Sequence, residues 1–331
     1  GLILMTMVPL YLGIELDLLP AGVHHLRTWL ETIERRRATF TAAPDFAWRM
    51  CLASVRDPHR IDLTSLRVAL NAAEPVRART VRELESAFLL DPVMTPAYGL
   101  AEATVGVSGW TPGRAIKVIE GGLVSVGKPF PGISVQILRG EEPAAAGERG
   151  EIAVRGPANT SGYLGNPEAS SRLFWKGDWI RTGDIGKIDE GGDLYIVGRE
   201  KNIIIQAGQT LSPREIEEVA DEVPRVRRSA ALGVDRGRLE GEQAYIFAEV
   251  RGPREKSGAD LRGLRAEIVD AFLGHFGFRP GRVVLIRPGT IPRTDSGKVR
   301  YPELKDLYVT GELERAGSLL DPDQTYGTSG S

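Results

Sequence analysis

The sequence predicts an α/β protein followed by a smaller α+β part, and three observations lead to that prediction. Residues 66–98 read as strand, helix and strand, a pattern that favours parallel strands joined by a crossover helix. Residues 121–201 contain short alternating segments separated by glycine and proline, which are typical of a mostly antiparallel β-subdomain. Beyond residue 202, helices and strands alternate over roughly a hundred residues, a normal domain size.

The opening segment, GLILMTMVPLYLG, is apolar but is interrupted by Pro9 and Gly13. It is too short to cross a bilayer, so we expect no membrane span and interpret it as a buried strand or helix cut off from something upstream. An amphipathic helix is predicted next, ended by the arginines at 35–37. Its apolar face is formed by Leu26, Trp29, Leu30 and Ile33.

The first sheet is predicted from three short segments. Residues 39–42 form a strand that ends at Pro44, residues 66–70 form a buried strand, and a further strand leads to Tyr98. A helix at 77–88 connects the last two strands. Its inward-facing residues are Val81, Leu84 and Phe88.

The remaining elements are predicted by alternation and by capping signals. Strands of the β-subdomain are expected at 133–138, 151–155 and 193–198, and a domain boundary is expected near residue 200. Ser212, Pro213 and Glu215 form a capping box that begins a helix. Further strands are expected at 203–205, 229–234, 244–250 and 282–286, with a helix carrying Leu261, Leu264, Ile268 and Phe272 and a polar, disordered tail from 322.

The amino-acid composition excludes some classes of protein and favours others. The 331 residues are 42% hydrophobic and 26% charged, as in a globular protein of two or three domains. With 42 basic and 44 acidic residues, the chain has no excess of positive charge that would indicate a nucleic-acid partner. Cys51 is the only cysteine, which excludes an internal disulfide and fits a reducing, cytoplasmic compartment. The four histidines show no metal-ligand spacing.

Five loop motifs stand out because ligands of α/β proteins bind where strands end in loops. Two of them, NAAEP at 71–75 and YGLAE at 98–102, directly follow predicted parallel strands. The others are RTGDIG at 181–186, GREKN at 198–202 and IPRTDSGKVR at 291–300. The lysine of the last motif follows no GxxxxGK[ST] pattern, so an ordinary P-loop nucleotidase is excluded.

In this order and spacing, the motifs resemble those of the adenylate-forming superfamily, which contains acyl-CoA synthetases, fatty-acyl-AMP ligases and peptide-synthetase adenylation domains. The resemblance runs from Pro9 to about Leu307. PLYLGIELDLLP, PDFAW and NAAEPV look closest to the fatty-acyl-AMP ligase branch and its long-chain relatives. Ala101, where many relatives carry threonine, also fits that branch.

The resemblance implies a particular domain organisation. Residues 1–201 would be the later part of a large α/β adenylating domain, with its β-rich subdomain at about 121–201. Residues 202–310 would be a small, mobile α+β C-terminal lid, and 311–331 a tail. The Ser/Thr/Gly-rich phosphate loop that the family carries upstream does not occur here. The sequence is therefore interpreted as a fragment, as half of a split enzyme or as a degenerate relative.

The resemblance also assigns nucleotide-binding roles. Ala72, Ala73, Glu74 and Pro75 would form the loop beside the adenine and the acyl pocket, and Tyr98, followed by Gly99, would lie against the adenine ring. Glu102 would hold Mg²⁺ at the ATP phosphates, because a hard cation prefers carboxylate oxygen. Asp184 would accept hydrogen bonds from the ribose hydroxyls, and Arg199 would orient ribose and phosphate.

The same resemblance assigns roles to four residues at and beyond the domain boundary. Lys298 would be the catalytic cation that offsets the repulsion between a carboxylate and the α-phosphate, on a loop shaped by Pro292 and Gly297. Lys201 and Asn202 would form the hinge, where many relatives carry aspartate at the second position, and Gly208 would line the thiol tunnel.

Each residue also has an ordinary structural explanation. Tyr98 is equally a core tyrosine, Glu102 a helix-start carboxylate, and Asp184 and Gly208 turn residues. Taken together, the motifs favour an enzyme that converts a carboxylic acid into acyl-AMP with ATP and Mg²⁺. We expect this acid to be a fatty acid. The acyl group would then pass to the phosphopantetheine thiol of CoA or of an acyl carrier protein. No insertion that would decide between these acceptors is recognised between residues 108 and 126. The alternative is a non-catalytic module that binds adenylate or carrier protein.

Overall fold

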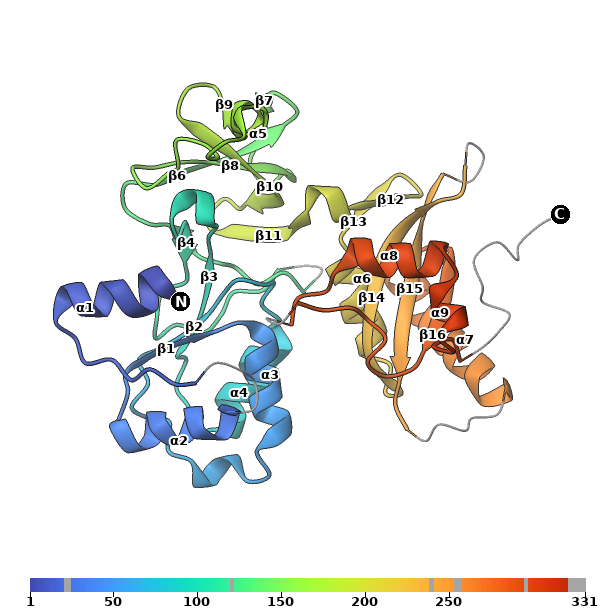
Figure 1. Cartoon of the computed structure of the whole chain (residues 1–331), viewed down its shortest axis with the longest axis horizontal. Helices are drawn as coiled ribbons and strands as arrows, with labels where there is room; N and C mark the ends of the chain where they lie inside the picture. Colours follow the sequence, from blue (N-terminus) through green and yellow to red (C-terminus); the bar gives the residue numbers. More distant parts are fainter. Residues whose placement is uncertain (21–24, 120–121, 238–240, 253–257, 295–296, 321–331) are drawn as a thin grey trace. The chain divides into compact units, whose positions relative to one another are not determined.

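The computed structural model describes residues 1–20, 25–119, 122–237, 241–252, 258–294 and 297–320. The chain divides into two compact units, Gly1–Val197 and Gly198–Ser331, and each is described here by itself (Figure 1). Among the described residues, no helix is long and apolar enough to cross a membrane. The tail predicted to be disordered lies outside the described residues.

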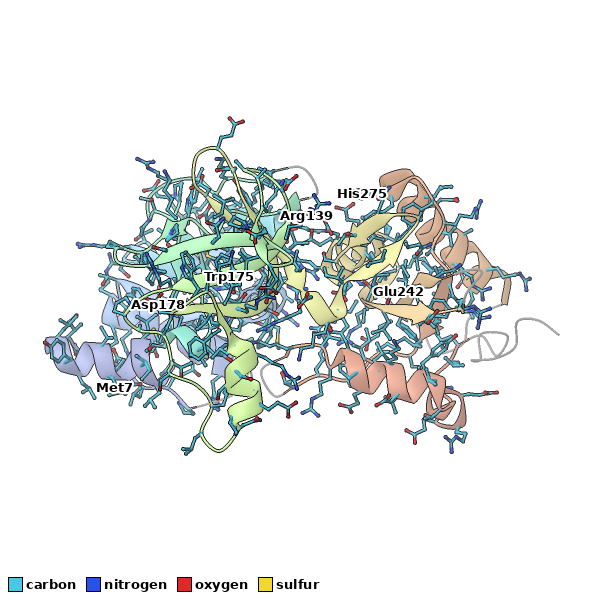
Figure 2. All side chains as sticks on the ribbon, turned by 90° about the horizontal axis from the view of Figure 1, so that it is seen from above. Met7, Arg139, Trp175, Asp178, Glu242 and His275 are labelled. Atoms are coloured by element: carbon cyan, nitrogen blue, oxygen red, sulfur yellow. The ribbon has the colours of Figure 1, made fainter. Side chains whose placement is uncertain are left out.

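The opening segment is helical, but the prediction that it is buried was wrong. A π-helix covers Leu2–Met7 and continues as α1, Val8–Leu12, which ends at Gly13 in the left-handed conformation (φ 66°). Its large apolar side chains are exposed, including Leu10 at 68% and Tyr11 at 89%. Met7 is 52% exposed and extends from the surface of this helical segment (Figure 2).

The first sheet confirms the predicted parallel strands. β1 (Phe40–Ala43), β2 (Val68–Asn71) and β3 (Met94–Tyr98) pair in parallel, and the short strands β4 (Ser108–Gly109) and β5 (Lys128–Pro129) continue the sheet antiparallel. The helices α2 (Leu26–Arg36), α3 (Asp45–Ser54) and α4 (Ala78–Ala87) pack with these strands around one apolar core. Leu30, Trp48 and Leu84, one from each helix, are fully buried in it.

The second sheet is antiparallel, as the alternating segments predicted. Its order is β11-β10-β8-β6-β7, with β9 paired to β10. The strands are β6 (Ser134–Arg139), β7 (Glu142–Pro143), β8 (Gly150–Arg155), β9 (Phe174–Trp175), β10 (Trp179–Ile188) and β11 (Leu194–Arg199), and the helix α5 (Pro167–Leu173) precedes β9. On one face, Trp175 and Trp179 meet edge to face (Figure 2 labels Trp175).

The second unit contains a hairpin and a mixed sheet. β12 (Ile204–Gln206) pairs with β13 (Gln209–Leu211), and the main sheet has the order β14 (Val226–Asp235), β15 (Glu242–Val250) and β16 (Arg282–Ile286). β14 and β15 are antiparallel, whereas β15 and β16 are parallel and are joined through α7 (Gly258–Phe276).

Both faces of this sheet are covered. α6 (Pro213–Asp221) and α7 supply one core, and α8 (Tyr301–Val309) and α9 (Glu312–Arg315) supply the other (Figure 1). The predicted capping box is confirmed: the Ser212 hydroxyl accepts from the Glu215 amide, and the Glu215 carboxylate accepts from the Ser212 amide. β15 alternates between the two cores, so its even-numbered residues face α6 and α7.

Candidate functional site

The fold brings together two residues that were predicted to bind the nucleotide. Tyr98 is the last residue of β3, and Asp184 lies in β10, 86 positions later. The Tyr98 hydroxyl donates a hydrogen bond of 2.6 Å to Asp184 Oδ2, and both residues are buried. The pairing of β10 with β8 shifts register between Arg181 and Ile185, so Asp184 sits at an irregularity of the strand.

The backbone conformation around Asp184 explains how its carboxylate is held beside Tyr98. Gly183 has a φ of 66°, a left-handed conformation that glycine adopts without steric cost. Thr182 donates its hydroxyl to the carbonyl of Ile152 at 2.8 Å and accepts the Asp184 amide at 3.1 Å. These contacts fix the Asp184 backbone, so a carboxylate is held beside a phenol in a protected environment. Such a pair can accept hydrogen bonds from ligand hydroxyls and present an aromatic ring.

The segment after Tyr98 is tightly folded on itself. A β-carbon at Gly99 would lie 1.7 Å from the carbonyl oxygen of Val105, so only glycine fits this position. The turn that follows, Ala101–Ala103, carries Glu102, and Thr104 has a φ of 67°. The close approach of two backbone segments therefore sets the position of both Tyr98 and Glu102.

Glu102 is half-buried and is linked to the second sheet's loops. Its Oε1 accepts from the Tyr163 hydroxyl at 2.7 Å, and its carbonyl accepts from the Thr160 amide at 2.7 Å. Among the residues that the structure describes, none donates a hydrogen bond to Glu102 Oε2. A carboxylate oxygen in that condition fits the ligand type that Mg²⁺ prefers. Within the same described ranges, no group of three or more His, Cys, Asp or Glu side chains could hold a metal by itself.

The predicted loop 72–75 lies beside the start of α3. Ala73 has a φ of 72°, which is uncommon for a residue with a β-carbon, and it is exposed, whereas Ala72 is half-buried. The Glu74 carboxylate accepts a hydrogen bond from the Phe46 amide. Burial raises the pKa of Glu74, an effect that this hydrogen bond opposes.

Asp45 supports the same loop, and no role for it was predicted from the sequence. It is 1% exposed and accepts from the Asn71 side-chain amide (3.1 Å), the Arg77 amide (3.2 Å) and the Thr80 hydroxyl (3.1 Å). Arg49 forms an ion pair with it at 3.2 Å. The segment PDFAW carried the resemblance, but nothing in it signalled that its aspartate would be buried.

The first predicted site residues of the second unit lie at and just after the end of β11. Arg199 is the last residue of β11, and Lys201 and Asn202 lie in the short 3₁₀ turn Glu200–Asn202. Gly208 lies at the tip of the β12–β13 hairpin with Ala207; their φ values of 75° and 52° match the primed two-residue turn that hairpins favour. The ordinary turn explanation for Gly208 is thereby satisfied.

Lys298 lies in the stretch formed by residues 292–294 and 297–300, the part of this motif that the structure describes, which is called the lysine loop below. The Arg300 amide donates to the Pro292 carbonyl at 2.9 Å and closes the loop at its ends. Within it, the Thr294 amide donates to the Lys298 carbonyl at 2.9 Å, and the Lys298 amide donates to the Thr294 hydroxyl at 3.1 Å. The Lys298 side chain is exposed.

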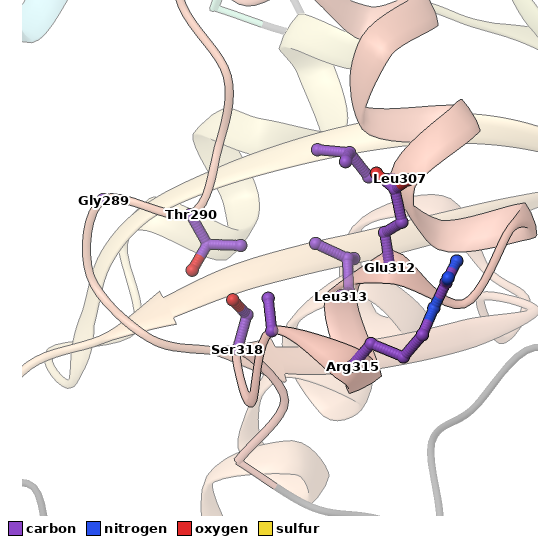
Figure 3. Close-up of a pocket in the computed structure, with 8 residues that line it drawn as sticks. Gly289, Thr290, Leu307, Glu312, Leu313, Arg315 and Ser318 are labelled. Atoms are coloured by element: carbon purple, nitrogen blue, oxygen red, sulfur yellow. The ribbon is translucent and has the colours of Figure 1, made fainter.

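A surface pocket of about 530 Å³ also lies in the second unit, between the segment before the lysine loop and α9 (Figure 3). Its lining is Gly289, Thr290, Leu307, Glu312, Leu313, Arg315, Ala316 and Ser318. None of the predicted site residues lines this pocket, which was not predicted from the sequence.

Comparison with known proteins places these features in a family. Residues 1–164 match the model described as AMP-binding enzyme. The medium-chain-fatty-acid–[acyl-carrier-protein] ligase JamA of Moorena producens is 31% identical over 95% of this chain and 60% of its own length. A putative fatty-acid–CoA ligase of Mycobacterium tuberculosis, fadD25, is 30% identical with the same coverage. The chain thus spans 60% of the length of these curated relatives.

Solved structures agree with the sequence matches. ATP-bound MatB from Rhodopseudomonas palustris superposes with a TM-score of 0.78 at 26% identity, over 93% of this chain and 57% of that one. A structure from a study of fatty acyl-adenylate ligases of E. coli and L. pneumophila gives 0.74 at 26% identity, over 88% and 57%. Residues 1–164 therefore carry the AMP-binding domain of this family, and the chain as a whole is similar to adenylate-forming enzymes.

Proposed function

We propose that the protein activates a carboxylic acid, and specifically a fatty acid, as acyl-AMP. It then passes the acyl group to the phosphopantetheine thiol of CoA or of an acyl carrier protein. The Tyr98–Asp184 pair carries this proposal, because it joins two predicted nucleotide-binding motifs at a buried hydrogen bond of 2.6 Å. The curated relatives named above are fatty-acid ligases that use one or the other acceptor, which supports the substrate class.

In the first step, a carboxylate oxygen of the acid attacks the α-phosphorus of ATP, and the bond to pyrophosphate breaks. Asp184 would accept the ribose hydroxyls, the ring of Tyr98 would lie against adenine, and the loop 72–75 would border the base and the acyl chain. Arg199 would assist at the ribose, and the ammonium of Lys298 would offset the charge that builds on the phosphoryl oxygens. Glu102 would hold Mg²⁺, which neutralises phosphate charge when bound.

In the second step, the acceptor thiolate attacks the acyl carbonyl carbon, a thioester bond forms, and AMP leaves with the electrons of the mixed-anhydride bond. CoA and carrier protein present the same thiol, so one chemistry serves both. We infer a hinge at Lys201 and Asn202 and a thiol path along Gly208 from the resemblance. A reducing, cytoplasmic compartment is also inferred, consistent with Cys51, whose thiol is buried and has its pKa raised by burial to about 12.

ATP–pyrophosphate exchange with a series of fatty acids tests the first step. Replacing Lys298 by alanine should lower the exchange rate by about 100-fold or more, the size expected for removing one group that stabilises transition-state charge. Lys305→Ala is the matched control, because Lys305 is an exposed lysine of α8 in the same unit. An exchange rate that survives the Lys298 substitution would contradict the role given to that residue.

Binding of a non-hydrolysable acyl-adenylate analogue tests the nucleotide site independently of catalysis. Asp184→Asn should weaken binding by about 10- to 100-fold, since charge-assisted hydrogen bonds contribute about 1.5–3 kcal/mol each. Asp178→Asn is the control: it is an exposed carboxylate at the surface of the same antiparallel region (Figure 2). Analogue binding without any exchange would favour the non-catalytic binding module over the enzyme.

A further inference from the structure

A buried carboxylate interrupts the apolar face of β15. Tyr245 and Phe247 point from this strand into the core formed with α8, and the alternation places Glu249 next on the same face. Glu249 is only 2% exposed. A buried charge is unfavourable unless it is paired and hydrogen-bonded, so its presence at a core position calls for a specific set of partners.

The partners of Glu249 lie just before the lysine loop. Its Oε1 accepts from the amides of Gly289, at 2.8 Å, and Ile291, at 3.2 Å. Its Oε2 accepts from Arg227 at 2.7 Å. The backbone amides of Gly289 and Ile291 are thus hydrogen-bonded to β15, the central strand of the sheet. Both lie immediately before residue 292, where the lysine loop begins.

A second buried carboxylate holds the other end of the loop. Glu217 of α6 is 6% exposed, and its Oε1 accepts from the Tyr301 hydroxyl at 3.0 Å and from the Ala231 amide at 3.1 Å. Tyr301 is the first residue of α8 and directly follows the lysine loop. The loop therefore starts at one buried carboxylate and finishes at another, both on regular elements of the second unit.

The charges around the loop show why an acidic anchor is suited to this place. Arg293, within the lysine loop, and Arg227 both act to lower the pKa of Arg228, after the larger effect of burial, and Glu249 opposes them. Asp221 opposes them as well, and Glu249 supplies a counter-charge that Arg227 contacts directly at 2.7 Å.

We propose that Glu249 and Glu217 are positioning residues that hold the two ends of the lysine loop and thereby fix where Lys298 is presented. This proposal rests on the function proposed for Lys298 in the adenylation step. Its physical basis is that the Arg300 amide closes the loop onto the Pro292 carbonyl, so holding Gly289, Ile291 and Tyr301 in place also holds the described loop residues, Lys298 among them.

The test compares the two half-reactions in variants of the full chain. In Glu249→Ala, single-turnover formation of acyl-AMP should slow by about 100-fold, the effect of a misplacement of about 1 Å, while transfer from supplied acyl-AMP to the thiol should change by less than about twofold. Glu249→Gln keeps an oxygen for the two amides and should restore most of the adenylation rate. An unchanged adenylation rate in Glu249→Ala would overturn the proposal, as would an equal loss in both half-reactions.

Two further variants protect the test against a simple failure to fold. Tyr301→Phe removes only a hydroxyl and should slow adenylation by about tenfold, the size of one hydrogen bond to a charged group. Glu303→Ala is the matched control, because Glu303 is an exposed carboxylate that forms a surface ion pair with Arg300, one of the described loop residues, at 3.2 Å, an interaction that contributes little. Equal rates for Tyr301→Phe and Glu303→Ala would contradict an anchoring role for Glu217.

Hydrogen exchange separates this proposal from the proposed function. In Glu249→Ala, the amides of Gly289 and Ile291 lose their acceptor and should exchange at least about tenfold faster, while the amides paired between β14 and β15 keep their protection. Unchanged protection at these two amides would overturn the anchoring proposal. Absence of adenylation in the unsubstituted protein would instead overturn the function proposed for Lys298, and the exchange result would still decide whether the carboxylates hold the loop.

Discussion

Gly99 offers a sharp test of how the first unit positions its predicted nucleotide site. A β-carbon at this position would lie 1.7 Å from the carbonyl oxygen of Val105, 2.7 Å from its carbon and 2.9 Å from the Cα of Gly106. Since favourable contacts begin at about 3.5 Å, Gly99→Ala must separate the two backbone segments by about 1.8 Å. Backbone cannot rotate away as a side chain does, so we expect a loss of about 3 kcal/mol in unfolding free energy, at the upper end of overpacking costs.

The same displacement should also disturb the predicted nucleotide site, because Tyr98 and Glu102 lie on either side of the contact between Gly99 and Val105. Urea unfolding followed by tryptophan fluorescence measures the stability, and titration with the acyl-adenylate analogue measures the binding, which should weaken by about tenfold or more. Gly263→Ala is the control for the chemical change: Gly263 lies in α7 with nothing within 4 Å of a β-carbon, so alanine should add up to about 1 kcal/mol of stability. A Gly99→Ala protein within about 0.5 kcal/mol of the original would refute the reasoning.

Three other predictions concern single contacts. Tyr98→Phe removes the hydroxyl that reaches Asp184 and should lower unfolding free energy by about 1–3 kcal/mol, because a buried carboxylate loses a donor; urea titration measures it. Ser212→Ala removes a helix cap and should cost about 1 kcal/mol, seen as a lower unfolding midpoint of the second unit. Lys117→Met should lower the thermal midpoint at neutral pH: burial acts to raise the pKa of Asp189, but hydrogen bonds, first that of Lys117, outweigh it and leave this pKa at about 2, below the unfolded value of 3.8. The stability from this lowered pKa is present above 3.8 and is lost as pH falls toward 2, so the two proteins should converge in acid; a difference that persists at pH 2 would contradict this account.

Periodicity in the sequence predicted the regular elements well where one face is buried. The helix carrying Leu30 and Ile33, the strands leading to Tyr98 and the capping box at Ser212 are all confirmed. α3 was not predicted, because the run from Phe46 to Cys51 is apolar on nearly all sides and follows a proline, which leaves no clear period. The opening segment was wrongly expected to be buried, since apolarity alone does not specify a partner.

The candidate site was partly accessible from the sequence and partly not. Tyr98 and Asp184 could be singled out by their motifs, but only the fold shows that 86 positions of chain bring them into contact. Asp45, Glu217 and Glu249 could not be found, for a common reason. In a sequence, an aspartate or glutamate is normally predicted to be a surface residue. The partners of these three carboxylates include backbone amides. Almost every residue type has a backbone amide, so such partners cannot be recognised from the sequence.

The exposed helix at the start of the chain has a consequence for the protein in concentrated solution. Leu10, Tyr11 and Leu12 each expose apolar surface to water, and the net charge of the whole chain is only −2. With so little electrostatic repulsion between molecules, attraction between such surfaces is opposed only weakly. We therefore expect colloidal behaviour that is set by this helix: self-association that grows with concentration and with added sulfate, and that is relieved by placing a few acidic residues along its face.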